Sequence, residues 1–287
     1  MKSLLLSAIT KKAVLDYTDH PSPVLIITGE PGAGKHFLAL SIASKILDID
    51  FDKICSYPFL SKISPENNSI SIETIRQLQK DLIRVVPGNN KIRQAVILDG
   101  AQKLGHEAQN ALLKTLEDTK QGTVFILCMP KITDVLETIA SRARELRVLP
   151  VSLSDVEKFF YNKYSQADIK QAHRLTQGKM GSIAAILAGE KTDLTDSIGE
   201  VKNVLAMTQY DRLLQINRLC KEKDSVISFL EAFSLLSHAS ARNTLKYGKI
   251  PEAKKWQTIS KRVARAQQAL KLNASPKLTL TDLFLNI

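Results

Sequence analysis

The 287-residue sequence has little cysteine and no long apolar run. Cys55, Cys128 and Cys220 lie far apart, which is typical of a protein from a reducing compartment, and we expect each thiol to act as a small buried hydrophobe. No segment approaches the ~18 consecutive apolar residues of a membrane-spanning helix. These absences argue against a disulfide scaffold and a membrane protein, and they predict a cytoplasmic location.

A secretion signal is not recognisable either. Met1–Ala8 is apolar, but Lys11 and Lys12 follow without a cleavage pattern, so we expect this segment to belong to an amphipathic first helix. The net charge of +11 favours nucleic acid, acidic proteins or anionic lipid as partners without choosing among them. The length predicts two or three domains.

The first half of the chain alternates apolar runs with helical patterns. Four runs have the length and composition of strands buried on both faces: Val24–Thr28, Ala95–Asp99, Thr123–Met129 and Glu145–Leu149. Between them lie three helical patterns, Phe37–Leu47, Ser71–Val86 and His106–Lys120. The alternation predicts an α/β domain with an open parallel sheet over residues 1–150.

After Pro150 only helical patterns remain. They start with a helix capped by Ser154 or Asp155 and ending near Tyr164, and they continue at 167–176 and 182–188. A hinge is predicted at 189–193, and breaks in the later helices near 248–251 and 275–276. The expected layout is therefore α/β followed by all-α, with domains at 1–150, 151–192 and 193–287.

A glycine-rich segment follows the first predicted strand and opens a helix. Gly29, Gly32, Gly34 and Lys35 have the spacing of a phosphate-binding P-loop, in which backbone N–H groups and the lysine hold phosphate oxygens. The Ser or Thr that normally helps hold Mg²⁺ is replaced by His36, and imidazole is a poor ligand for this hard ion. We therefore predict weak ATP or ADP binding at most.

A second acidic motif shows a matching loss. The strand 95–99 ends in Asp99, which is expected to face the metal region of the same pocket. The next residue is Gly100, which has no side chain to orient or deprotonate an attacking water. Hydrolysis by this chain's own site is therefore not expected, and no catalytic residue is assigned in cis.

Several segments beyond these two motifs resemble AAA+ clamp-loader subunits. Residues 70–76 resemble the stretch before the acidic motif, 98–104 its DEA(E/D)xL element, and 109–117 the AxNALLKxLEE helix, which is the most specific match. The family resembled is that of the bacterial DNA polymerase III clamp loader, in its delta-prime type. The resemblance implies a P-loop α/β domain, a helical lid and an oligomerising helical collar.

The resemblance also implies roles for individual residues. Ser141-Arg142-Ala143 resembles the SRC motif, whose arginine reaches the nucleotide of a neighbouring subunit, so Arg142 is a candidate finger in trans; the alternative is a surface arginine in a basic turn. Met129 stands where a polar sensor residue is expected, and the lid lacks its sensor arginine. The zinc module of related ATPase subunits is missing, since 48–66 contains only Cys55, and neither zinc nor another metal is predicted.

Together these features predict a non-hydrolysing subunit that needs no cofactor. The implied partners are clamp-loader motor and delta-type subunits, the sliding clamp and primer-template DNA within the complex. Two alternatives stay open: a slow AAA+ ATPase, and a stand-alone DNA-binding module.

The C-terminal region carries a concentrated positive charge. Nine Lys or Arg lie between residues 246 and 277, against a single acid, Glu252: Lys246, Lys249, Lys254, Lys255, Lys261, Arg262, Arg265, Lys271 and Lys277. They can contact DNA phosphates or form the solvated face of a helix whose apolar stripe is Trp256, Ile259, Val263, Ala266 and Leu270. The stripe favours the solvated face.

Overall fold

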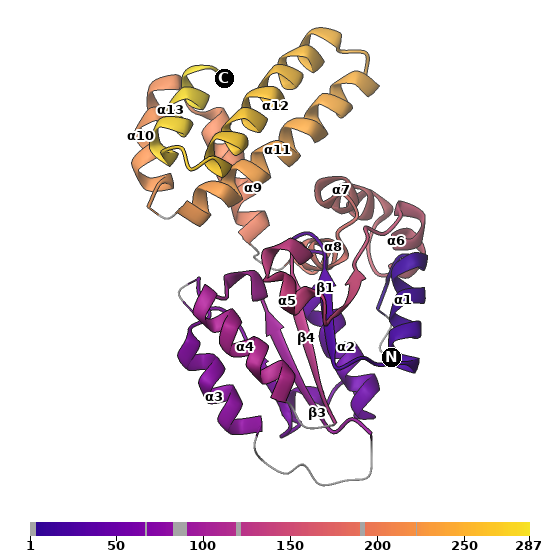
Figure 1. Cartoon of the computed structure of the whole chain (residues 1–287). Helices are drawn as coiled ribbons and strands as arrows, with labels where there is room; N and C mark the ends of the chain where they lie inside the picture. The colour runs from indigo at the N-terminus through magenta and orange to yellow at the C-terminus, as the bar shows by residue number, and fades with distance from the viewer. Residues whose placement is uncertain (1–3, 67, 83–90, 119–121, 190–192, 222) are drawn as a thin grey trace. The chain divides into compact units, whose positions relative to one another are not determined.

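The protein divides into two compact units in the computed structural model (Figure 1). One unit is Met1–Phe159 with Gly178–Gly181, and the other is Phe160–Gln177 with Ser182–Ile287. The structure describes residues 4–66, 68–82, 91–118, 122–189, 193–221 and 223–287. The three-domain division at 150 and 192 stays a prediction. Residues 190–192 of the predicted hinge lie outside the described residues, and the next helix begins at Asp193.

The first unit is built on a five-stranded sheet in the order β2-β3-β4-β1-β5. Its strands are β1 (Val24–Thr28), β2 (Leu60–Ile63), β3 (Gln94–Asp99), β4 (Thr123–Met129) and β5 (Arg144–Arg147). Every pair of neighbours is parallel, which confirms the predicted open parallel sheet. β1 is buried throughout and β4 is buried from Val124 to Met129, as expected when both faces are covered.

Helices cover both faces of this sheet (Figure 1). α1 (Ala8–Asp19) and α2 (Lys35–Leu47) pack on one face, against alternate residues such as Leu25, Ile97 and Ile126. α3 (Ile72–Leu82) and α4 (His106–Asp118) pack on the other, against Ile26, Leu98 and others. The alternation follows from the strand, in which successive side chains point to opposite faces.

Two strands differ from the prediction because they lie at the sheet edges. β2 was not predicted, since its sequence Leu-Ser-Lys-Ile is too polar to stand out, and it is only partly buried. β5 begins at Arg144 and ends at Arg147 instead of spanning 145–149, although Val148 N still donates to Thr28 O at 2.8 Å. Edge strands need only one apolar face, so a search for apolar runs places them poorly.

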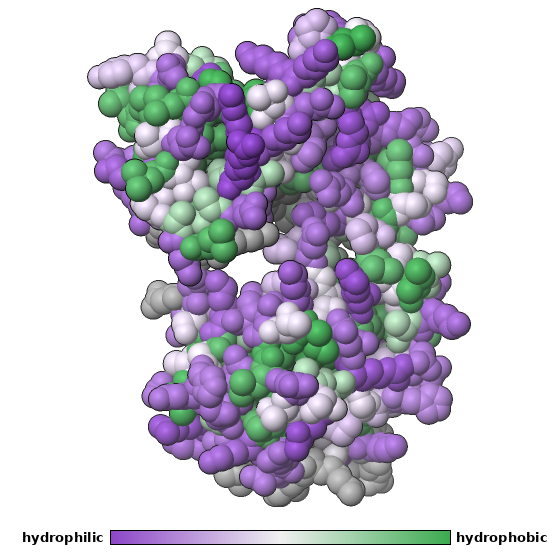
Figure 2. All heavy atoms as spheres, turned by 45° about the horizontal axis from the view of Figure 1, so that its top comes forward, coloured by the Kyte–Doolittle hydropathy of each residue, from purple (hydrophilic) through white to green (hydrophobic). Residues whose placement is uncertain are grey.

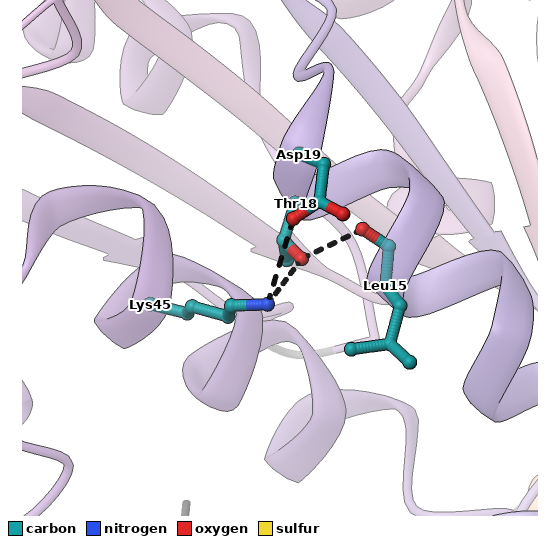
Figure 3. A network of polar contacts seen from close by, with 4 residues as sticks. All are labelled: Leu15, Thr18, Asp19 and Lys45. Atoms are coloured by element: carbon teal, nitrogen blue, oxygen red, sulfur yellow. Dashed lines mark hydrogen bonds and ion pairs between the residues drawn. The ribbon is translucent and has the colours of Figure 1, made fainter.

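The start of the first helix was also predicted wrongly. Ser7 caps α1 by accepting from Thr10 N, so the apolar residues Leu4 and Leu6 precede the helix and pack against the core. The other end of α1 is tied to α2. Lys45 Nζ donates to Thr18 Oγ1 at 2.7 Å and lies 4.0 Å from Asp19 Oδ1, while Thr18 Oγ1 donates to Leu15 O (Figure 3).

In the described part of the chain after residue 152, every element of regular secondary structure is a helix. These helices are α6 (Leu153–Phe159), α7 (Gln166–Thr176), α8 (Met180–Leu187), α9 (Asp193–Ala206), α10 (Gln209–Leu219), α11 (Lys223–Lys246), α12 (Ile250–Lys271) and α13 (Pro276–Leu285). The breaks predicted near 248–251 and 275–276 are confirmed, whereas the helix expected to reach Tyr164 ends at Phe159. The fold class, α/β followed by all-α, is confirmed.

The core of the second unit lies between its long helices. Phe229, Phe233 and Phe284 are fully buried and meet edge to face. The predicted apolar stripe of α12 contributes Ile259, Val263 and its neighbours to this cluster, with Trp256 partly buried beside it. The stripe is therefore core, as predicted.

The surface is mixed in character. Figure 2 shows hydrophobic residues as separate groups among hydrophilic ones on the face that it displays. Within the described part of the chain, every helix is too short or too polar to span a bilayer. The three cysteines are free; Cys128 is buried and Cys220 is half-buried, but Cys55 is exposed, which contradicts its prediction as a buried hydrophobe.

Candidate functional site

The predicted phosphate loop joins β1 to α2. Its glycines lead to Gly34, which caps α2, and Lys35 is the first residue of that helix. Lys35 Nζ donates to two carbonyls of the loop itself, Gly29 O at 2.7 Å and Glu30 O at 2.9 Å. Burial lowers the pKa of Lys35, an effect that the carboxylates of Asp99 and Glu30 oppose. The amine is thus satisfied by its own loop.

A second segment of the first unit, 178–181, packs directly on this loop. A Cβ added to Gly181 would lie 2.8 Å from Gly32 O and 3.0 Å from Gly34 N, closer than side-chain carbons approach such atoms. Lys179 Nζ also pairs with Glu30 Oε2 at 3.3 Å. Backbone N–H groups of a P-loop normally face phosphate oxygens. Here the chain's own backbone at Gly181 lies against them.

His36 and Asp99 come together as predicted from the two motifs. His36 Nδ1 lies 3.1 Å from Asp99 Oδ2, with both side chains partly exposed. The approach lacks hydrogen-bond geometry, because Nδ1 has no hydrogen-bond partner, and it is an ion pair only while the imidazole is protonated. Among the described residues, no group of three His, Cys, Asp or Glu side chains is arranged to hold a metal ion. The prediction of no zinc remains a prediction.

Gly100 has a structural reason to be glycine. Its φ of +72° is in the left-handed region, and a Cβ there would lie 2.9 Å from Pro65 Cγ. A glutamate at this position would therefore meet both backbone strain and a steric clash. The backbone conformation and the neighbouring proline therefore both favour glycine at position 100.

The residue beside Asp99 on the next strand is Cys128, not Met129. Asp99 pairs with Cys128 in the sheet, and Cys128 lies in the core cluster on the α2 side. Met129 is buried on the opposite face, in the cluster with α3 and α4, and its assignment to the sensor position stays a prediction. Burial raises the pKa of Cys128, which keeps the thiol neutral. Counting alternate positions along the predicted strand would have found this residue.

Arg142 lies apart from these groups, in the turn between α5 (Glu137–Ala140) and β5. Its guanidinium donates to Thr138 O at 3.0 Å and pairs with Glu117 Oε1 at 2.9 Å, and about half of its side chain is exposed. Glu117 is on α4 and was not recognised from sequence as a partner. Arg144, by contrast, is engaged by Asp16 and lies over the Tyr17 ring. Both arginines have an acidic partner, and the side chain of Arg142 is the more exposed, at 47% against 37% for Arg144.

Comparison with known proteins places this arrangement in a family context. The profile described as "DNA polymerase III, delta subunit" matches residues 11–152. Replication factor C small subunits are similar as well. The chain is thus similar to clamp-loader proteins over its N-terminal half and over about two thirds of its length.

The relatives match part of their own length. The replication factor C small subunit of Sulfurisphaera tokodaii is 29% identical over 198 residues, which cover 67% of this chain and 59% of that protein. The one from Methanococcus maripaludis is 27% identical, with 69% and 59% covered. The chain therefore spans about three fifths of these curated relatives.

A solved structure has a similar fold over nearly the whole chain. The gamma subunit-related DNA polymerase III protein of Thermotoga maritima aligns with a TM-score of 0.54 and 15% identity, covering 96% of this chain and 97% of that one. This likeness supports the fold, a parallel sheet followed by helices. The similarity is to replication factor C small subunits as much as to bacterial subunits, so the delta-prime assignment is finer than the comparisons reach.

Proposed function

We propose that this chain is a non-hydrolysing, delta-prime-type subunit of a sliding-clamp loader. It assembles with AAA+ motor and delta-type subunits through its C-terminal helices, and it helps to place a sliding clamp on primer-template DNA in the cytoplasm. The residues at 151–192 act as its lid and those at 193–287 as its collar. The proposal requires no cofactor and no zinc.

The observation that carries the proposal is the self-bonded phosphate loop. Lys35 is held by the carbonyls of Gly29 and Glu30, and Gly181 lies against Gly32 and Gly34. A nucleotide must displace these contacts to bind, so its affinity is low. His36 and Gly100 remove the usual metal ligand and base, which favours an interaction role over a motor role.

Arg142 is the group that we propose to act on a neighbour. A guanidinium that is half exposed, and held only by a carboxylate and a carbonyl, can exchange these partners for a phosphate of an adjacent subunit's nucleotide. Such an arginine stabilises charge on the transferring phosphoryl group even when its own subunit is inert.

Two measurements test the proposal. The purified full chain is assayed for ATP hydrolysis with Mg²⁺ and primed DNA, where we expect no turnover above background; robust turnover would favour the ATPase alternative. Co-purification from the native source, with mass spectrometry of the partners, should recover clamp-loader subunits. A chain that is recovered on DNA without them would instead favour the stand-alone DNA-binding module.

A further inference from the structure

The two longest helices of the second unit, α11 and α12, form an antiparallel hairpin (Figure 1). A hollow lies between side chains of these two helices. The hollow has a volume of about 430 Å³. From α11 it is lined by His238, Arg242 and Leu245, which recur at helical spacing, and from α12 by Ser260 and Lys261. We name it the hairpin groove. None of these residues belongs to the phosphate loop or to the Arg142 turn.

One polar pair in the hairpin groove is held in place by a hydrogen bond, and two positive charges there have no acidic partner in the described part of the chain. Ser260 is buried, and its hydroxyl lies 3.1 Å from His238 Nε2, which fixes the imidazole at the groove. Arg242 and Lys261 form no ion pair with any residue that the structure describes. Two cations therefore meet at the groove without a carboxylate between them, which is a site that attracts an anion.

The positive charge continues along the α12 side of the groove. Lys254, Lys261 and Arg265 are exposed and lie seven and four residues apart, which places them on one helix face. Lys254 and Arg265 also lack an ion pair among the described residues. The only acid between 246 and 277, Glu252, is paired with Lys249 at 3.5 Å. Lys254, Lys261 and Arg265 thus form a row of positive charge beside the groove, which we call the cationic track.

Apolar and aromatic groups are exposed at the same end of the hairpin. Leu245, which lines the groove, is 50% exposed, and Tyr247 in the following turn is 70% exposed. A solvated helix face needs no exposed aromatic ring. Proteins that bind single strands combine a positive groove for the phosphates with aromatic side chains on which bases stack. The hairpin offers both components.

The dimensions fit the backbone of a nucleic-acid strand. At about 1.5 Å per residue, the eleven steps from Lys254 to Arg265 span about 16 Å of the helix. A strand carries one phosphate per roughly 3.4 Å in a duplex, so the track is long enough for several phosphates. We propose that the hairpin groove and this track bind single-stranded nucleic acid, with Arg242, Lys261 and Arg265 on phosphates and Tyr247 against a base. This inference does not rest on the clamp-loader role.

Salt-dependent binding by the full chain tests the proposal. A fluorescently labelled 20-nucleotide oligo-dT is titrated with protein between about 50 and 200 mM NaCl, and binding is followed by anisotropy. Arg242→Gln/Lys261→Gln/Arg265→Gln should weaken binding at least tenfold at the low salt. Because each phosphate contact on a single strand contributes about 0.7 to the slope of log K against log salt, the slope should shrink by about 2.

A matched control separates this track from general positive charge. Lys11→Gln/Lys12→Gln/Lys53→Gln removes the same charge from exposed lysines of the first unit. Its affinity should stay within about twofold of the wild type, and both triple variants should melt at the wild-type temperature. If the two variants lose equal affinity, binding follows net charge and the hairpin groove is not a site.

Substitutions of Tyr247 test base stacking separately from charge, because they change the affinity for oligo-dT without changing the net charge. Tyr247→Ala should weaken binding to oligo-dT about fivefold or more, whereas Tyr247→Phe should keep it, because stacking needs only the ring. Equal binding by the Ala variant, together with equal affinity for a duplex of the same length, would contradict single-strand recognition. Displacement of oligo-dT by polyglutamate at lower concentration would assign the groove to an acidic protein instead.

Discussion

The phosphate loop and the Arg142 turn belong to the same unit, but they differ in how far their polar groups are open to solvent. In the loop, the polar groups are directed inward: Lys35 is bonded to loop carbonyls, and Gly181 covers Gly32 and Gly34. In the turn, Arg142 is half exposed, and its guanidinium contacts the carboxylate of Glu117 and the carbonyl of Thr138. The polar groups of the loop are thus engaged within the chain, whereas the guanidinium of Arg142 is partly open to solvent.

Loss of Arg142 is the change with the largest expected effect. Arginine fingers contribute about 10³-fold or more to phosphoryl transfer at the site that they serve. In the assembled complex, Arg142→Ala should abolish the ATPase contribution of the one neighbouring motor that it contacts, while assembly remains intact. Turnover of the reconstituted complex measures this effect.

The control for that variant is Arg147→Ala, which removes an exposed arginine from β5 that has no described ion pair. It should leave turnover unchanged. If Arg142→Ala and Arg147→Ala complexes turn over ATP at the wild-type rate, the turn does not serve a neighbour and the contrast between the two regions disappears.

Substitution of Gly100 tests whether position 100 can accept a residue that has a side chain. A residue with a Cβ must adopt φ +72°, which costs roughly 1–2 kcal/mol, and must also push against Pro65. Gly100→Ala should therefore lower the free energy of unfolding by about 2 kcal/mol, measured by urea denaturation. Gly199→Ala, in α9 with nothing within 4 Å of the new Cβ, should be neutral or stabilising.

The same geometry limits restoration of activity. His36→Thr with Gly100→Glu supplies the missing hydroxyl and carboxylate, but the strained glutamate displaces the turn that positions it. We expect no turnover from the double variant. Vigorous ATP hydrolysis would mean that the closed loop opens readily, and the distinction between an inert cis site and a retained trans arginine would be lost.

Much of the first unit was predictable because its central strands are apolar on both faces. Val24–Thr28 and Thr123–Met129 were placed to the residue, and the parallel order followed from alternation with helices. β2 and the ends of β5 escaped, since a polar edge strand gives no continuous apolar run. His36 and Asp99 were paired correctly from two motifs, because both motifs end strands at one edge of a parallel sheet.

What the sequence could not reveal are contacts between distant segments. The pairing of Arg142 with Glu117, the approach of Gly181 to Gly32, and the contact of Gly100 with Pro65 all join residues at least 25 positions apart. The position of Cys128 beside Asp99 was not predicted either, because the pairing register of two strands depends on how they pack. The lengths of apolar runs and the capping residues determine where helices and strands begin and end. The contacts named here depend on how those helices and strands pack together.

Loss of the Glu117 carboxylate should change the turnover of the complex less than loss of Arg142. A half-exposed ion pair contributes at most about 1 kcal/mol, so its loss can change a rate by no more than about fivefold. Because Arg142 must leave Glu117 to reach a neighbour's phosphate, Glu117→Gln should raise the turnover of the complex modestly. Glu137→Gln, an exposed acid of α5, is the control. A loss as severe as that of Arg142→Ala would instead make Glu117 the residue that positions the arginine.

Lys35 should show the smallest effect on activity. In a motor, the P-loop lysine holds the nucleotide phosphates, and its removal disables the site. Here the amine is bonded to Gly29 and Glu30, so Lys35→Met should leave the ATPase and clamp-loading rates of the complex within about twofold of wild type. A tenfold loss would show that a nucleotide at this loop is used, and that the inward-facing region is not inert.

Lys35 should instead affect how the free energy of unfolding depends on pH. Because burial lowers its pKa, the unfolded chain holds this proton more tightly than the folded chain, and the penalty is complete below the folded pKa. As pH rises toward the ordinary lysine value of about 10.4, the wild type should gain stability relative to Lys35→Met. Urea denaturation at several pH values from 7 upward measures this difference. A constant difference would mean that the amine is hydrated when folded, and that the loop is open.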